Sequence, residues 1–142
     1  MRILVIGGIS RSLVNFRGPL LSEMVKRGHE VHSCAGEVQA DVVEKLEQMG
    51  VRFHPVEIER RGTSVLGDWQ YYKALREVIG QVHPDVVLSY TVKPVVYGSI
   101  AAGRARTGRV GALITGAGAA QPGTTWKESV IATIARRLYR VG

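Results

Sequence analysis

The adjacent glycines Gly7 and Gly8 open the stretch GGISRS at 7–12, the first place in this sequence where the residue types could do chemistry. Glycine has no Cβ, so the backbone there can come close to a ligand, and a helix that follows can offer free N–H groups to an anion. Arg17 closes the same segment and can pair with a phosphate or a carboxylate. A tight strand-to-helix turn with a surface arginine is the alternative interpretation.

A second stretch, SYTVKP at 89–94, places two hydroxyls and a cation close together. Ser89 and Thr91 can hydrogen-bond to sugar hydroxyls, and Lys93 can bind a phosphate. Because Lys93 precedes a proline, we expect it to be extended and aimed from the start of the next helix. A capping loop with a solvated lysine is the alternative.

A third stretch, ITGAG at 114–118, contains Thr115 and Gly116 in a run of small residues. This composition favours a close approach of the backbone to a ligand or to the other side of a cleft, although a plain flexible turn has the same composition. None of the three stretches matches the GxGxxG dinucleotide loop, and no acidic residue follows at the position that reads a ribose. We therefore expect no nicotinamide or flavin cofactor.

The elements that must position these stretches follow from hydrophobic periodicity. A continuous apolar run ended by Gly7-Gly8 predicts a strand over 1–6, and further strands are predicted over 30–35, 51–58, 86–90 and 110–115. Helical spacing of apolar residues predicts helices over 19–27, 40–49, 69–82, 94–107 and 124–141, with Asp68 as the N-cap of the third.

Strands that alternate with helices at this spacing predict an α/β fold with one parallel sheet and helices on both faces. Right-handed crossovers make it a doubly wound, Rossmann-like domain, and 142 residues fit a single domain over 1–142. In this fold a ligand binds outside the carboxyl ends of the strands, near the point where the strand order reverses. The three stretches follow the first, fourth and fifth strands, so we expect them to form the site.

The net charge of +7 is concentrated at the end of the chain, where residues 104–142 contain seven basic residues and one acidic residue. Arg136, Arg137 and Arg140 lie on one side of the helix predicted at 124–141, opposite its apolar side. Ordinary packing of the apolar side explains this pattern, and a basic amphipathic helix facing an anionic membrane explains it too. An anionic partner suits this charge in either case.

Composition limits the remaining classes of protein. No apolar run approaches the roughly 20 residues that span a bilayer, and the short run after Arg2 is stopped too early for a signal peptide. Cys34 is the one cysteine, and we expect it to be a buried small hydrophobe. His29 and His32 fall on opposite faces of a strand, so we expect no metal site. These features predict a cytoplasmic protein.

Several segments together resemble the N-terminal half of bacterial GT-B glycosyltransferases of family 4, in particular enzymes that extend capsular, O-antigen or lipid-linked oligosaccharides. The resemblance covers nearly the whole chain in the right order. It is carried by SLVNFRGPL at 12–20, KRGHEV at 26–31, RRGT at 60–63 with Asp68, HPDVVLSYTVKP at 83–94, YGS at 97–99 and ITGAG at 114–118.

The resemblance implies two Rossmann-like domains, with the acceptor in the N-terminal domain and the nucleotide-sugar donor in the C-terminal one. It also implies a retaining, metal-independent hexosyltransferase whose acceptor is often a sugar on an undecaprenyl diphosphate carrier. The basic residues would then face carrier phosphates and the inner membrane surface. The sequence departs from the family pattern at Ala117, where a larger apolar residue is usual, and we expect no counterpart of the donor-binding domain with its paired glutamates within these 142 residues.

The sequence therefore predicts the acceptor-binding domain of a glycosyltransferase, inactive alone, that serves cell-surface glycan synthesis and needs no cofactor beyond its nucleotide-sugar substrate. The residues predicted to bind the acceptor or its phosphates are Gly7, Gly8, Arg17, Ser89, Thr91, Lys93, Thr115 and Gly116. Its expected partners are a donor-binding domain or subunit, a lipid-linked sugar, the inner membrane surface and a second copy of the chain. The alternative is a non-catalytic subunit that recruits a partner to the membrane. The few aromatic residues argue against nucleic acid.

Overall fold

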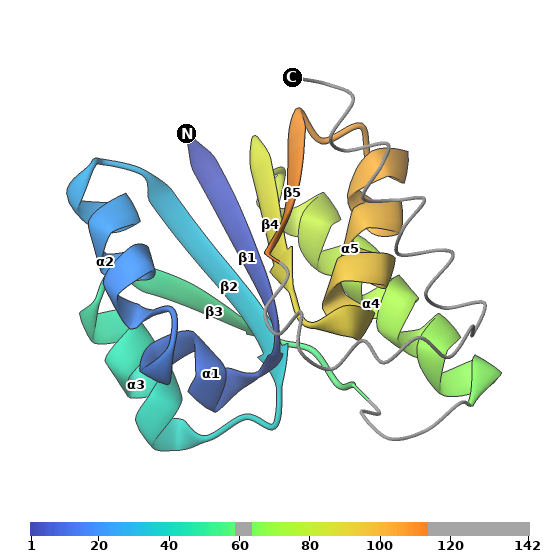
Figure 1. Ribbon diagram of the computed structural model, residues 1–142, viewed down its shortest axis with the longest axis horizontal. Coiled ribbons are helices and arrows are strands. Elements are labelled where there is room, and N and C mark those ends of the chain that lie inside the picture. Colours follow the sequence, from blue (N-terminus) through green and yellow to red (C-terminus); the bar gives the residue numbers. More distant parts are fainter. Residues whose placement is uncertain (59–63, 114–142) are drawn as a thin grey trace, which may run out of the picture.

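The computed structural model of the protein describes residues 1–58 and 64–113 (Figure 1). The helix predicted at 124–141, the loop predicted at 116–123 and the last two residues of the strand predicted at 110–115 lie outside the described residues.

Five strands form one parallel sheet, which confirms the predicted fold class. The strands are β1 (Arg2–Ile9), β2 (Glu30–Gly36), β3 (Val51–Pro55), β4 (Val86–Tyr90) and β5 (Arg109–Leu113). Their order in the sheet is β3-β2-β1-β4-β5, so the order reverses between β1 and β4. The segments that follow these two neighbouring strands therefore lie side by side at the carboxyl edge of the sheet.

The helices cover both faces of the sheet (Figure 1). They are α1 (Ser10–Asn15), α2 (Gly18–Lys26), α3 (Ala40–Gln48), α4 (Val65–Val82) and α5 (Val92–Arg104). The first three pack on one face through Leu13, Leu21 and Leu46, and the last two pack on the other, α4 through Leu75 and α5 through Ala101. Both faces of β1 are thereby buried, as its continuous apolar sequence predicts.

The first turn of the fold differs from the prediction. Strand β1 continues through Gly7 and Gly8 to Ile9, and helix α1 follows directly, where we predicted a strand end at Ile6 and a loop. The glycines do not stop the strand because they remain extended, with a register irregularity against β2 between Ile6 and Ile9. Helix α1 is held against the sheet by Leu13, which is fully buried.

Four further boundaries differ from the prediction by two residues or more, one of them the end of helix α5 at Arg104, three residues before its predicted end. Helix α4 begins at Val65, because the Ser64 hydroxyl accepts a hydrogen bond from the Gly67 N–H at 3.2 Å and is the N-cap in place of Asp68. Helix α5 begins at Val92, so Lys93 is helical and not extended. The proline after it lies in the first turn, where its missing N–H needs no partner. Strand β3 ends at Pro55, three residues early.

Helix α5 approaches the sheet closely at Gly98, on the face where β4 presents Ser89. A Cβ at Gly98 would lie 2.6 Å from the Ser89 Oγ and 3.1 Å from the Ile6 Cδ1. Ser89 is fully buried, and its hydroxyl has no hydrogen-bond partner among the described residues. A glycine on the helix is thus what allows α5 to pack at this distance.

We predict that Gly98→Ala destabilises the fold by about 1–3 kcal/mol, because the added methyl overpacks the interface between helix and sheet. Gly103→Ala in the same helix is the matched control. A Cβ there meets no described atom within 4 Å, so the gain in helix propensity should stabilise by about 0.5–1 kcal/mol. Urea unfolding measures both values, and equal stabilities for the two variants would contradict the close approach at Gly98.

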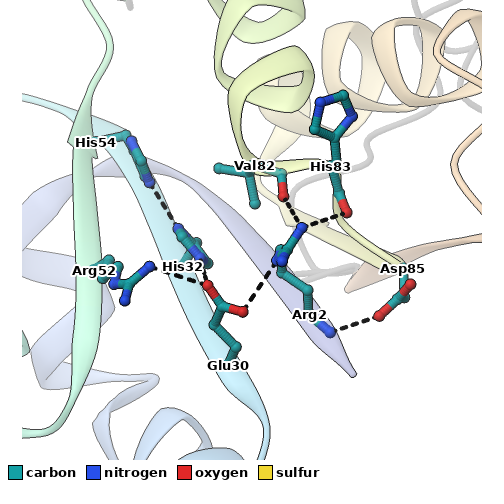
Figure 2. A network of polar contacts seen from close by, with 8 residues as sticks. All are labelled: Arg2, Glu30, His32, Arg52, His54, Val82, His83 and Asp85. Carbon is teal, nitrogen blue, oxygen red and sulfur yellow. Dashed lines mark hydrogen bonds and ion pairs between the residues drawn. The ribbon is translucent and has the colours of Figure 1, made fainter.

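A polar network joins the amino ends of the strands (Figure 2). The Glu30 carboxylate accepts hydrogen bonds from the Arg2 Nε and the Arg52 Nη1, each at 3.1 Å, and lies 3.1 Å from the His32 Nε2. The other nitrogen of that ring, Nδ1, is 2.9 Å from the His54 Nε2, with the two rings stacked. Sequence reasoning missed this pair, because it depends on how β2 and β3 align.

Arg2 extends the same network to the other elements. Its backbone N–H donates to the Asp85 carboxylate at 2.7 Å, and its Nη1 donates to the Val82 carbonyl at 2.8 Å (Figure 2). The network therefore fastens the end of α4 and the start of β4 to β1 and β2.

The His32–His54 contact makes the stability of the domain depend on pH. Burial, followed by the charges of His32 and Arg52, lowers the pKa of His54. A short bond between two ring nitrogens also needs one nitrogen without a proton, so the pair cannot keep the bond with both rings charged. His54 is therefore neutral in the folded protein at pH values where it is charged in the unfolded chain.

We predict that the free energy of unfolding is highest above about pH 6.5, the usual pKa of histidine, and decreases as the pH falls toward the lowered pKa of His54. The unfolded chain binds more protons than the folded protein in this pH range, so lowering the pH favours unfolding. Urea unfolding at pH 7.5 and 5.5 tests it. His54→Gln should reduce the difference between the two pH values, whereas His29→Gln, outside the network, should leave it as in the wild type. An unchanged difference in His54→Gln would contradict the prediction.

Candidate functional site

A pocket of about 640 Å³ opens at the carboxyl ends of β1 and β4, next to the point where the strand order reverses. Its walls come mainly from the start of α1, the residue that precedes α2 and the turn between β4 and α5. It is lined by Gly8, Ile9, Ser12, Phe16, Arg17, Ile58, Tyr90, Thr91, Val92, Lys93 and Pro94. Two of the three stretches singled out in the sequence therefore meet in one cavity.

The two glycines of β1 create the space into which the end of β4 packs. A Cβ on Gly7 would collide with the Tyr90 hydroxyl, and its distance to the Tyr90 Cζ would be 2.8 Å. A Cβ on Gly8 would lie 3.0 Å from the Thr91 Oγ1. Gly8 lines the pocket, whereas Gly7 lies behind Tyr90. Their role in this structure is thus to admit a neighbouring aromatic ring and hydroxyl.

Thr91 has a strained backbone at the pocket wall. Its φ of 68° and ψ of 156° fall in a region that is essentially restricted to glycine, and a branched Cβ makes this conformation still less favourable. Such a residue costs of order 1–3 kcal/mol and persists only where its surroundings hold it in place. Here the hydroxyl packs over Gly8, and the backbone carbonyl accepts the Val95 N–H at 3.0 Å in the first turn of α5.

We predict that Thr91→Gly raises the free energy of unfolding by about 1 kcal/mol, because the strain relieved exceeds the entropy that a glycine adds to the unfolded chain. Thr91→Ala should give little of this gain, since any Cβ is disfavoured at this φ. Urea denaturation distinguishes the two variants. A Thr91→Gly protein less stable than the wild type would show that the threonine conformation is unstrained.

Arg17, the residue before α2, lies above the Tyr90 ring with its Cζ 4.9 Å from the ring centre. Its Nη1 donates to the Phe16 carbonyl at 3.2 Å, and its buried Nε has no hydrogen-bond partner among the described residues. The Tyr90 and Ser12 hydroxyls share a hydrogen bond of 2.8 Å. Burial raises the pKa of Tyr90, and the Ser12 hydrogen bond and the Arg17 charge act in the opposite direction. Tyr90 is therefore neutral, and its ring packs against the Arg17 guanidinium.

Lys93 also lines the pocket, and its Nζ lies 2.8 Å from the Asp68 Oδ1. The second oxygen of that carboxylate accepts a hydrogen bond from the Tyr97 hydroxyl at 2.8 Å. Burial, followed by the hydrogen bond to Asp68 and the charge of Asp68, raises the pKa of Tyr97 to about 12. We did not predict this contact, because we assigned Asp68 to the cap of its helix. The signal in the sequence is a carboxylate near the start of one helix and a lysine near the start of the next.

The structure places the predicted site residues unequally. Gly8, Arg17, Thr91 and Lys93 line the pocket, while Gly7 and Ser89 belong to the strands behind it. Thr115, Gly116, Arg136, Arg137 and Arg140 lie outside the described residues. Sequence reasoning did not select the lining residues Ser12, Phe16, Tyr90 and Val92.

Two general properties can be stated for residues 1–58 and 64–113. No three histidine, cysteine, aspartate or glutamate side chains in these ranges are grouped so that they could hold a metal ion. No helix in these ranges is both long and apolar enough to cross a bilayer. Cys34 is buried, as predicted, and burial raises the pKa of its thiol to about 12.

The sheet order, with a pocket beside its switch point, defines a Rossmann-like domain with the fold found in GT-B enzymes. Residues 14–141 match the family described as the glycosyl transferase 4-like domain, and the chain belongs to this family. The predicted relationship to an N-terminal GT-B glycosyltransferase domain is thereby confirmed. No curated protein matches the sequence significantly.

Solved structures share the fold at low sequence identity. A UDP-GlcNAc 2-epimerase from Neisseria meningitidis, bound to UDP-GlcNAc, is 16% identical with a TM-score of 0.66, over 97% of this chain and 39% of its own. The calicheamicin glycosyltransferase CalG4 is 18% identical with a TM-score of 0.58, over 98% of this chain and 42% of its own. A teicoplanin deacetylase is 13% identical with a TM-score of 0.56, over 75% of this chain and 67% of its own. The chain thus spans about two fifths of the length of the first two proteins.

Proposed function

We propose that this domain binds the acceptor of a glycosyltransferase that moves a sugar from a nucleotide-sugar donor to a lipid-linked or polysaccharide acceptor in cell-surface glycan synthesis. The observation that carries the proposal is the pocket at the switch point, which Arg17 lines and where the buried Nε–H of its guanidinium has no described partner. An unsatisfied buried donor on a permanent cation is costly, and a phosphate oxygen is the acceptor that suits it best.

The apolar side of the pocket supports an acceptor with a lipid portion. Phe16 is 72% exposed and Val92 is 58% exposed, and both residues line the cavity next to the cationic residues. Large exposed apolar side chains beside a cationic group fit a ligand that has a charged head and an apolar tail. A sugar carried on an isoprenoid diphosphate has this chemistry, and such an acceptor would place the domain at the cytoplasmic face of a membrane.

The donor side of the reaction belongs, on this proposal, to a second domain or subunit. The chain spans about two fifths of the GT-B neighbour CalG4 and of the epimerase, which supports a larger functional unit. We expect sugar transfer with retained configuration and without a metal only when that donor-binding part is present, and no turnover by the 142 residues alone.

Binding of farnesyl diphosphate, a short soluble isoprenoid diphosphate, tests the proposal by calorimetry. We predict that Arg17→Met weakens binding about tenfold or more, because a charge-assisted hydrogen bond is lost. Phe16→Ala should weaken the binding of farnesyl diphosphate but leave the binding of inorganic pyrophosphate unchanged, because only the isoprenoid would contact the phenyl ring. Arg27→Met is the matched control, because this exposed arginine pairs with Glu23 on α2, away from the pocket. Equal affinities for the wild type and Arg17→Met would contradict the proposal.

A further inference from the structure

We propose that Asp68 is the positioning residue of the pocket, where it holds the Lys93 ammonium in place for an oxyanion of the acceptor. The inference rests on the proposed function, which supplies the anionic ligand, but the contact itself is a property of the fold. Asp68 is absent from the pocket lining, so it acts through Lys93 and not on the ligand.

The contact joins the first turns of two helices that are far apart in the sequence. Asp68 lies in the first turn of α4 and Lys93 in the first turn of α5, and the ammonium is 2.8 Å from the Oδ1 of the carboxylate. Tyr97, one helical turn after Lys93, donates to the Oδ2 at 2.8 Å. Both oxygens of the Asp68 carboxylate therefore contact residues of α5, one Lys93 and the other Tyr97. These two contacts fix the orientation of the carboxylate as well as its position.

Both side chains of this ion pair are mostly buried, unlike those of the exposed pair on α2. The side chains of Lys93 and Asp68 are 19% and 24% exposed. By contrast, those of Arg27 and Glu23, a pair within α2, are 71% and 52% exposed. Water screens an exposed pair, and ordering its long side chains cancels most of the gain, whereas a partly buried pair keeps more of its electrostatic attraction. The Asp68 contact is thus strong enough to select one position of the lysine.

Fixing Lys93 in advance helps a ligand because a free lysine loses many rotamers on binding. The same contact has an opposing effect, since the Asp68 charge reduces the positive potential that a pocket anion experiences. Removal of the charge therefore has two opposite outcomes. If positioning dominates, an anion binds more weakly to the variant; if charge neutralisation dominates, it binds more tightly. The bond from the Tyr97 hydroxyl, which orients the carboxylate, supports positioning.

The contact can be tested without a ligand by limited acetylation of the protein, read by mass spectrometry. In Asp68→Asn the Lys93 amine should react several-fold faster relative to Lys26 and Lys45, and Tyr97→Phe should give a smaller increase in the same direction. Glu23→Gln, which removes the carboxylate of the exposed pair on α2, is the matched control and should leave Lys93 reactivity unchanged. An unchanged Lys93 reactivity in Asp68→Asn would overturn the proposal.

Binding of inorganic pyrophosphate then tests the role in the pocket. Asp68→Asn should weaken it about three- to tenfold, the range expected when one long side chain must be ordered on binding. Lys93→Met should weaken it similarly, and the double variant should be no weaker than the worse single variant, because the two residues act as a unit. Tighter or unchanged binding by Asp68→Asn would overturn positioning. Faster acetylation in Asp68→Asn together with no pyrophosphate binding by the wild type would support the Asp68 contact and contradict the proposed function.

Discussion

The close contact between the ends of β1 and β4 is the constraint on which the pocket depends. Because Gly7 and Gly8 have no side chains, the Tyr90 ring and the Thr91 hydroxyl can occupy the space above them. The tyrosine ring in turn supports the Arg17 guanidinium, and its hydroxyl is bonded to Ser12 at the start of α1. One pair of glycines thus fixes the relative positions of three segments, each of which contributes to the cavity.

The two ends of the sheet differ in how well their polar groups are paired. At the amino ends, Glu30, His32 and their partners form a network in which polar groups are matched, and this network fastens α4 to the sheet. At the carboxyl ends lie a strained threonine and a buried Arg17 donor with no described partner. Strain and unsatisfied polar groups persist where the surrounding structure holds them, and they are typical of ligand sites.

Much of the fold could be predicted from the sequence, because the apolar runs of a parallel sheet are continuous and the helices are amphipathic. The strands at 30–35 and 86–90 and the helix at 40–49 were found within one residue of their predicted bounds. The meeting of the Gly7-Gly8 and Thr91–Lys93 stretches also followed from the fold class. The short helix α1 was missed because only six residues form it, too few to show a period.

The parts of the site that could not be predicted are contacts between distant side chains. The pairing of Asp68 with Lys93 spans 25 residues, and that of His32 with His54 spans 22. Each depends on the exact alignment of two elements, which local propensity does not specify. The positive φ of Thr91 is likewise imposed by packing, since its residue type argues against it.

The central claim is that the pocket at the switch point binds a phosphate-bearing lipid acceptor through Arg17 and Lys93. A crystal structure of the protein with farnesyl diphosphate tests it most directly. We predict electron density for the diphosphate within hydrogen-bond distance of the Arg17 guanidinium and the Lys93 ammonium, with the isoprenoid against Phe16 and Val92. Density for the ligand at another site, with this pocket holding only water, would contradict the claim.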